Sequence, residues 1–268
     1  MRSGVTVLAL AFALCATVFI ACSKKGSDAP STCKLINFTQ GLDPQNDTSF
    51  EFNYDAHNNI SKIAIAYNYY SFHHFDTAQL YYSNSRLDSF RAISQGGIQY
   101  IYSSNNLLSA IKSDYGAVLA INYNNNQPTL ITNSFGSITY DSLFFNADGD
   151  ITAIKEFDYT KQLSRVIAFQ YSAKVISSTD KALALINSSF PNTLFGHNIG
   201  NFSGGNADFV SKYFGKHYIN SFSSHAYLQS PEFMNGSCTY KFDNNGNIVS
   251  YVIKSTDTLT YTYKYTCN

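Results

Sequence analysis

The sequence predicts an all-β protein: an antiparallel meander of about 11 to 14 strands that forms a strongly curved sheet or a near-closed barrel. Three observations favour this fold class. The 268 residues are 16% aromatic and only 13% charged, against about 25% charged residues in ordinary domains, and Tyr and Phe favour strands. Apolar and polar residues alternate over long stretches, and one hairpin-like motif recurs. Basic and acidic residues are equal, 18 each, so no basic excess exists to neutralise phosphates and nucleic acid is not an expected partner.

The first 21 residues have the pattern of a secretory signal. Arg2 precedes an apolar run of 16 residues at 5–20, which is short for a spanning helix and typical of a signal peptide. The run ends at Ala21-Cys22, and a small residue before Cys is similar to the bacterial lipoprotein signal. This resemblance implies that residues 1–21 are removed, that Cys22 is lipidated, and that 22–32 form a flexible tether. Residues 33–268 are then a single β-domain.

Three cysteines remain for pairing if Cys22 carries lipid: Cys33, Cys238 and Cys267. An exported chain is exposed to an oxidising compartment, where disulfides form. Cys33 begins the first predicted strand and Cys267 ends the last, so they face each other if those strands are adjacent and antiparallel. We predict a Cys33–Cys267 disulfide, with Cys33–Cys238 as the alternative. The chain has no C-x-x-C motif or His/Cys cluster, so no metal site is predicted.

A short motif repeats along the chain and predicts hairpins. It consists of an aromatic residue, then Asp or Asn, a polar turn, and Ile six residues after the aromatic. Asp and Asn side chains bond the backbone two residues on, and Gly and Asn tolerate positive φ, so each copy predicts a tight loop. Three copies align without gaps, at 52–60, 143–151 and 240–248, and weaker copies begin at Tyr81, Tyr102 and Tyr123.

Alternation along the flanking segments predicts antiparallel strands with one wet face. Near the C-terminus Leu259, Tyr261 and Tyr263 share one face, and Thr residues occupy the other. The stretch 179–235 breaks this pattern and holds two of the five Pro. We expect there an irregular insert with short helices, which packs on or inside the sheet or carries the binding surface.

The hairpins resemble YD-repeats, and the whole arrangement is similar to a family of Bacteroidota lipoproteins of unknown function that is described as porin-like in fold. The likeness is carried by Cys22, by Cys33-Lys-Leu-Ile, by Asp243-Asn-Asn-Gly-Asn-Ile, and by the closing segment 261–267. It implies a lipoprotein of the cell envelope at the outer membrane, on either its periplasmic or its surface face. The family supplies no catalytic residues to carry over.

The sequence favours a non-enzymatic binding or scaffold module over an enzyme. It contains no G-x-S-x-G elbow, no H-E-x-x-H and no phosphate-binding loop, so neither an enzyme nor a cofactor is predicted. The expected partners are the membrane, through the lipid anchor, and a glycan, a peptide or an envelope protein. An envelope hydrolase of unknown substrate is the alternative. Because aromatic side chains on a rigid sheet anchor ligands well, the candidate ligand contacts are the densest aromatic cluster: Tyr67, Tyr69, Tyr70, Phe72, Tyr81 and Tyr82.

Overall fold

The computed structural model describes residues 33–43, 46–69, 72–84, 86–93, 96–114, 116, 118–134, 139–177, 181, 184, 213–228, 233–255 and 258–267. The predicted signal, Cys22, the tether, Tyr70 and most of 179–212 lie outside these residues. The chain divides into two compact units. One comprises Met1–Cys33 with Cys267–Asn268, and the other comprises Lys34–Thr266. In the first unit the described residues are Cys33 and Cys267.

The described residues form sixteen strands joined in chain order. Their bounds are β1 Cys33–Asp43, β2 Asn46–Tyr54, β3 Ile60–Tyr69, β4 Phe72–Ser83, β5 Arg86–Ala92, β6 Gly96–Tyr102, β7 Leu108–Ser113, β8 Val118–Asn124, β9 Gln127–Asn133, β10 Thr139–Phe145, β11 Ile151–Phe157, β12 Leu163–Val175, β13 His217–Ala226, β14 Phe233–Phe242, β15 Ile248–Lys254 and β16 Thr258–Cys267.

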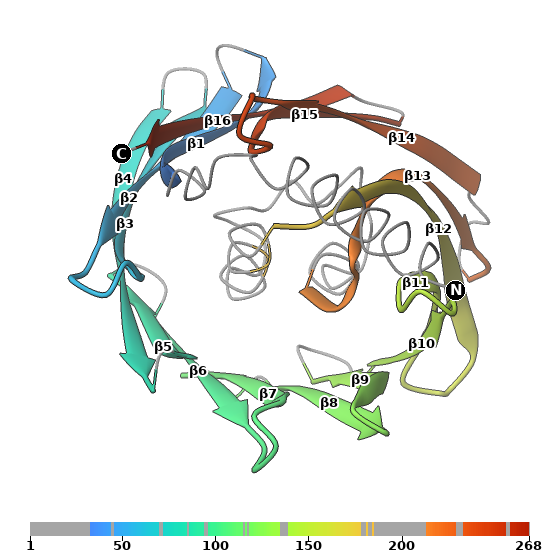
Figure 1. The fold of residues 1–268 in the computed structure, drawn as a ribbon. Helices are drawn as coiled ribbons and strands as arrows, with labels where there is room; N and C mark the ends of the chain where they lie inside the picture. Colours follow the sequence, from blue (N-terminus) through green and yellow to red (C-terminus); the bar gives the residue numbers. More distant parts are fainter. Residues whose placement is uncertain are drawn as a thin grey trace, which may run out of the picture. The chain divides into compact units, whose positions relative to one another are not determined.

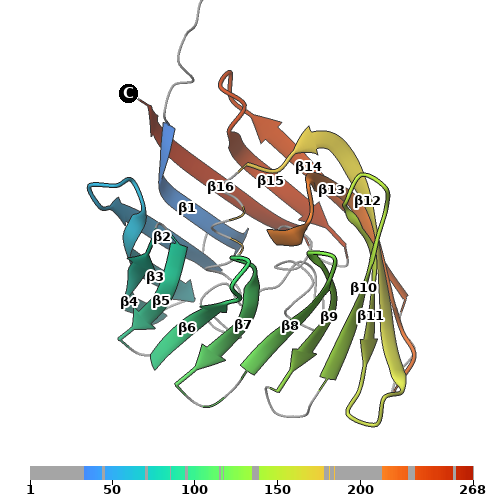
Figure 2. The same cartoon turned by 60° about the horizontal axis from the view of Figure 1, so that its bottom comes forward.

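The strands form one closed barrel. Each strand is hydrogen-bonded to its neighbours in sequence, and β1 lies beside β16 to complete the ring (Figure 1, Figure 2). The predicted all-β antiparallel meander is confirmed, with sixteen strands in place of the expected 11 to 14. The expected irregular insert at 179–235 is wrong at its C-terminal end, because β13 and the start of β14 lie within it. Register shifts where β13 pairs with β12 interrupt the alternation that would have revealed β13.

The apolar face of each strand points into the barrel. In β16, Leu259, Tyr261 and Tyr263 are buried, whereas the Thr residues between them are exposed. The same pattern places Phe50, Phe90 and many Ile and Leu residues in one continuous core. Burial of these apolar side chains stabilises the barrel. The outer wall carries most of the polar groups.

Five of the connections share one loop geometry. In each, the first residue donates its N–H to the carbonyl of the fifth, and the fourth donates to the carbonyl of the first. The fourth residue has positive φ in every case, and a register shift in the strand pair sits beside each loop, as in a three-residue hairpin with a bulge. The loops are 55–59, 103–107, 146–150, 158–162 and 243–247.

The loop at 158–162 was not predicted from the sequence. Phe157, Asp158 and Leu163 keep the spacing of the repeat, with Leu in place of Ile. Asp158 Oδ1 accepts hydrogen bonds from the backbone of Thr160 and Gln162 at 2.9 Å each. The weaker copies at Tyr81 and Tyr102 also have Leu at the sixth position after the aromatic, so the same pattern applied at Phe157 identifies this copy.

Tyrosine hydroxyl groups connect successive hairpins. Tyr102 Oη donates to the carbonyl of Leu87 at 2.9 Å, and Tyr123 Oη donates to that of Leu108 at 2.8 Å. Each acceptor is the residue six positions after the aromatic of the preceding copy. Burial raises the pKa of Tyr123 to about 12. The repeat therefore encodes both a loop and the contact with its neighbour, since a buried hydroxyl needs such a partner.

Candidate functional site

Of the predicted aromatic cluster, the structure describes the side chains of Tyr81 and Tyr82, which lie on opposite faces of the barrel wall. Tyr67 and Tyr69 belong to β3, and the register pairs Tyr69 with Phe72 of β4; the side chains of these three lie outside the described set. Tyr81 and Tyr82 are neighbours on β4 and point to opposite faces. Tyr81 is 49% exposed and donates to Gln79 Oε1 at 2.8 Å, whereas Tyr82 packs against the core and burial raises its pKa. These two side chains cannot contact one ligand.

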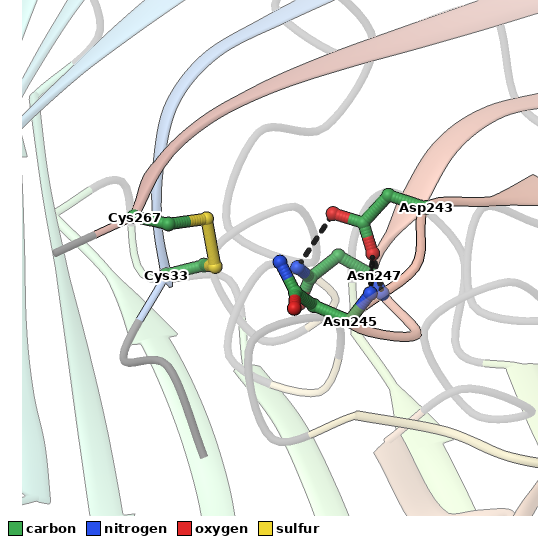
Figure 3. The surroundings of a disulfide bond; sticks show 5 residues. All are labelled: Cys33, Asp243, Asn245, Asn247 and Cys267. Carbon is green, nitrogen blue, oxygen red and sulfur yellow. Dashed lines mark hydrogen bonds between the residues drawn. A yellow bond between two sulfur atoms is a disulfide. The ribbon is translucent and has the colours of Figure 1, made fainter. Parts of the chain in front are cut away.

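The disulfide joins Cys33 to Cys267 across 234 residues of sequence (Figure 3). It links the first residue of β1 to the last residue of β16. Of the two pairings considered, this is the one the structure contains; Cys238 is buried in β14 and is not part of it. Figure 3 also shows the loop after β14, where Asp243 accepts hydrogen bonds from Asn245 and Asn247.

Asp150 holds the beginning of β13. Its carboxylate is buried and accepts hydrogen bonds from the backbone N–H of Lys216 at 2.7 Å and of His217 at 2.8 Å. The His217 Nδ1 lies 2.7 Å from the second oxygen. Burial acts to raise the pKa of Asp150, but these bonds from His217 and Lys216 outweigh it and lower the pKa. The carboxylate therefore fixes a segment 66 residues away in sequence.

The loop 146–150 has Asn at its first position and Asp at its fifth, which is the reverse of the loop 243–247. This order leaves the carboxylate of Asp150 available for the contact with Lys216 and His217. In the loop 243–247, Asp243 is first and Asn247 is fifth, and the Asn amide bonds back to the Asp carboxylate at 2.9 Å. In the loop 146–150 the order is reversed: Asn146 Oδ1 accepts the backbone N–H of Asp150 at 2.9 Å. The carboxylate of Asp150, the fifth residue, therefore accepts hydrogen bonds from Lys216 and His217, outside its own loop.

The chain just before β13 reaches the opposite wall of the barrel. Phe214 contacts the ring of Tyr123 on β8, with centroids 6.4 Å apart. Tyr213 packs against the core beside Tyr102 and Tyr123, and burial raises its pKa. Figure 1 shows the start of β13 turning toward the interior. The end of the predicted insert therefore packs inside the barrel.

A row of charged side chains crosses three neighbouring strands on the inner face. The register places Asp141 of β10 opposite Glu156 of β11, and Glu156 opposite Arg165 of β12. Arg165 Nη1 lies 3.7 Å from Glu156 Oε2, and the buried Nε and Nη1 of Arg165 donate to no acceptor in the described structure. Burial and the charge of Asp141 raise the pKa of Glu156 to about 8, against the opposing effect of Arg165. This shift favours the protonated form of Glu156.

The described residues contain no group of three or more His, Cys, Asp or Glu side chains placed to hold a metal ion. Within the same part of the chain, no helix has the length and apolar character needed to cross a membrane.

An exposed aromatic group lies on the outer wall at β13 and β14. The rings of His225 and Tyr227 are stacked, with centroids 4.3 Å apart and planes inclined by 17°. Phe233 pairs with His225 across the strands and meets its ring edge-on at 6.0 Å and 88°. Tyr227 is 45% and Phe233 66% exposed. We call His225, Tyr227 and Phe233 the outer aromatic patch.

The patch continues across the wall toward β10. The register aligns Lys155 of β11 with Val166 of β12 and Val166 with His225. Lys155 Nζ lies 4.9 Å above the ring of Phe144, which is itself exposed. Contiguous exposed apolar groups mark interaction sites more often than scattered ones do. We therefore take this region as the candidate functional site.

Sequence reasoning missed the patch because 179–235 was treated as irregular. Alternation within 221–227 places His225 and Tyr227 with Ser221 and Ser223, on the face opposite Phe222. Two aromatic residues on an otherwise polar strand face were the available signal.

The fold defines a class: a closed, sixteen-stranded antiparallel meander with an apolar interior. No protein-family model matches the chain, and no curated protein matches its sequence. Among solved structures, a porin-like protein from Bacteroides uniformis is similar at 13% identity and a TM-score of 0.56, over 87% of this chain and 98% of that one. A second porin-like protein, from Bacteroides vulgatus, aligns at 11% identity and a TM-score of 0.46 over the same shares. The first likeness supports the barrel fold.

Proposed function

We propose that this protein is a cell-envelope barrel that is anchored at the outer membrane by a lipid on Cys22 and binds its partner without chemical change. The observation that carries the proposal is the polarity of the wall. Inward positions are apolar and outward positions are mostly polar, which is the reverse of the order in membrane-spanning barrels. Such a wall suits contact with water, and a lipid would then supply the attachment to the membrane.

The outer aromatic patch is the proposed binding surface. Tyr and other aromatic residues carry much of the binding energy at recognition sites, and the partner is a glycan, a peptide or an envelope protein. A rigid sheet holds the rings in place, so little entropy is lost on binding.

An envelope hydrolase is the second candidate, favoured by the row Asp141–Glu156–Arg165. A carboxyl group with a raised pKa, such as Glu156, can act as a general acid. Both carboxyl groups are buried, however, so a substrate would have to enter the barrel. The exposed patch needs no such entry, and we therefore place binding first.

Labelling and fractionation test the anchor. Cells that produce the wild type or Cys22→Ser are fed labelled palmitate, and the membrane and soluble fractions are compared. We expect the wild type to be labelled and to be found in the membrane fraction. The variant should be unlabelled and should be found in the soluble fraction without added detergent. A Cys22→Ser protein that still needs detergent for extraction would contradict the proposal.

A thermal-shift panel of glycans and short peptides tests the binding function. A ligand at a hundred times its Kd stabilises the folded state by about 2.7 kcal/mol. We expect a shift with at least one member that is lost in Tyr227→Ala. A panel without any patch-dependent shift would argue against binding through this surface.

A further inference from the structure

The outer aromatic patch presents two flat surfaces that meet at a right angle. The stacked rings of His225 and Tyr227 form one, and Phe233, inclined by 88° to His225, forms the other. A sugar ring has an apolar face of C–H groups and a rim of hydroxyl groups. The C–H face can stack on an exposed ring while the hydroxyl rim reaches neighbouring polar groups.

The described polar side chains that flank the patch on β13 and β14 are uncharged, and the charged side chain of the wider region is Lys155 on β11, which lies over the ring of Phe144. On β13 the outward positions beside the patch are Ser221 and Ser223. The outward positions of β14 follow in the order Phe233, Asn235, Ser237, Thr239 and Lys241, so a charge is reached at the fifth of them. Hydroxyl and amide side chains both donate and accept hydrogen bonds, which matches the hydroxyl groups of a sugar.

This charge pattern separates a glycan from other partners. Protein interfaces gain specificity from complementary charges and are enriched in Arg, and anionic membrane surfaces attract clusters of Lys and Arg. The described outward positions of β13 and β14 near the patch hold neither, and Lys155 on β11 is a single cation, not a cluster. A neutral ligand loses nothing by the lack of a charged partner.

The exposed surface extends farther than one sugar ring. Phe144 lies on β10, three strands from His225 on β13, which corresponds to about 14 Å across the sheet. Lys155 and Val166 occupy the strands between them. A chain of several sugar units can span this distance along the wall, whereas a monosaccharide cannot.

We infer that the outer aromatic patch binds an uncharged polysaccharide, whose sugar rings stack on Tyr227 and Phe233 and whose hydroxyl groups bond to the Ser and Asn side chains beside them. This inference rests on the proposed function, because it names the ligand class of the same surface.

Calorimetric titration of the mature protein tests the inference. The probes are neutral glycans (β-glucan, mannan, xylan and dextran), acidic glycans (alginate and polygalacturonate), short peptides, and anionic phospholipid vesicles. We expect a neutral glycan to bind and its monosaccharide to bind more weakly. Tyr227→Ala and Phe233→Ala should each lower the affinity about tenfold, and Tyr227→Phe should keep most of it.

Phe75→Ala is the matched control. Phe75 is 75% exposed on β4, and β4 lies across the barrel from β13 and β14 in Figure 1. Its loss removes a ring that is at least as accessible as those of the patch and should leave the affinity unchanged. All four substitutions are at exposed positions, and unchanged thermal unfolding verifies their folding.

Each of the other possible results overturns this inference, the assignment of the site, or the proposed function as well. Patch-dependent binding of peptides or vesicles with no binding of neutral glycans overturns this inference and leaves the proposed function standing. Glycan binding that Tyr227→Ala and Phe233→Ala leave unchanged overturns the assignment of the site. A protein that binds no probe through the patch overturns both.

Discussion

At the scale of single residues, Glu156 shows how the barrel wall changes the proton affinity of a carboxyl group. Its pKa rises from 4.5 to about 8, first because burial disfavours the charged form and second because Asp141 faces it. Arg165, at 3.7 Å, offsets only part of this. The folded state therefore binds this proton more tightly than the unfolded state does. The resulting stabilisation is fully present below pH 4.5 and is lost as the pH rises through about 8.

Glu156→Gln is expected to remove the loss of stability that accompanies the rise in pH. Urea unfolding at pH 4 should give nearly the same free energy for both proteins, because below pH 4.5 the carboxyl group is mostly protonated in the folded and in the unfolded state. At pH 9 the variant should be more stable than the wild type by at least about 1 kcal/mol, since one pKa unit corresponds to about 1.4 kcal/mol. Glu51→Gln, at an exposed position of β2, is the control. Parallel pH profiles for wild type and Glu156→Gln would refute the expectation.

At the scale of elements, the five-residue loop is the unit from which the barrel is built. Its fourth position has positive φ and is Asn58, Asn106, Gly149, Lys161 or Gly246. Asn and Gly adopt this conformation readily, whereas a long side chain with a Cβ pays about 1–2 kcal/mol. Four of the five loops therefore have a residue suited to the position, and the loop at 158–162 does not.

At the fourth loop position, replacing Gly by Ala and replacing Lys by Gly should change the free energy of unfolding in opposite directions. Gly246→Ala is expected to lower the free energy of unfolding by about 1 kcal/mol, because φ is +83° there. Lys161→Gly should raise it by about 0.5 kcal/mol, the relief of strain less the entropy cost of Gly. Lys112→Gly, within β7, is the control and should destabilise. Chemical denaturation measures all three, and destabilisation by Lys161→Gly would show that the loop tolerates Lys without strain.

At the scale of the whole molecule, closure depends on strands from the two ends of the chain. β1 and β16 are neighbours in the ring although they are separated by the whole sequence. The Cys33–Cys267 disulfide joins residues 234 apart, and a cross-link over so long a loop removes much of the entropy of the unfolded chain. The disulfide thus lowers the entropy cost of bringing β1 and β16 together.

Removal of the disulfide should cost about 2–5 kcal/mol of stability. Cys33→Ser with Cys267→Ser, compared with the oxidised wild type in urea, measures the effect. Reductant should bring the wild type to the stability of the double variant and should not change the variant further. An oxidised and a reduced wild type of equal stability would rule out this contribution.

Much of the fold could be predicted because its rules are local. Alternation in β16, the Asp and Asn loops, and the positions of Cys33 and Cys267 are readable in short windows, since side-chain direction and turn chemistry depend on near neighbours. β13 and the outer aromatic patch were missed, because register shifts hide the alternation and because the ring contacts cross strands.

The sequence by itself determined the strand type, the loop geometry and the polarity of the two faces of the wall. The tertiary structure decided what depends on distant partners. It closed sixteen strands into a ring, turned Asp150 toward Lys216 and His217, brought Asp141 and Arg165 to Glu156, and placed Phe233 beside His225. The reason is physical: a turn is set by a few dihedral angles, whereas burial, shifted pKa values and surface patches arise from residues that meet only when the chain has folded.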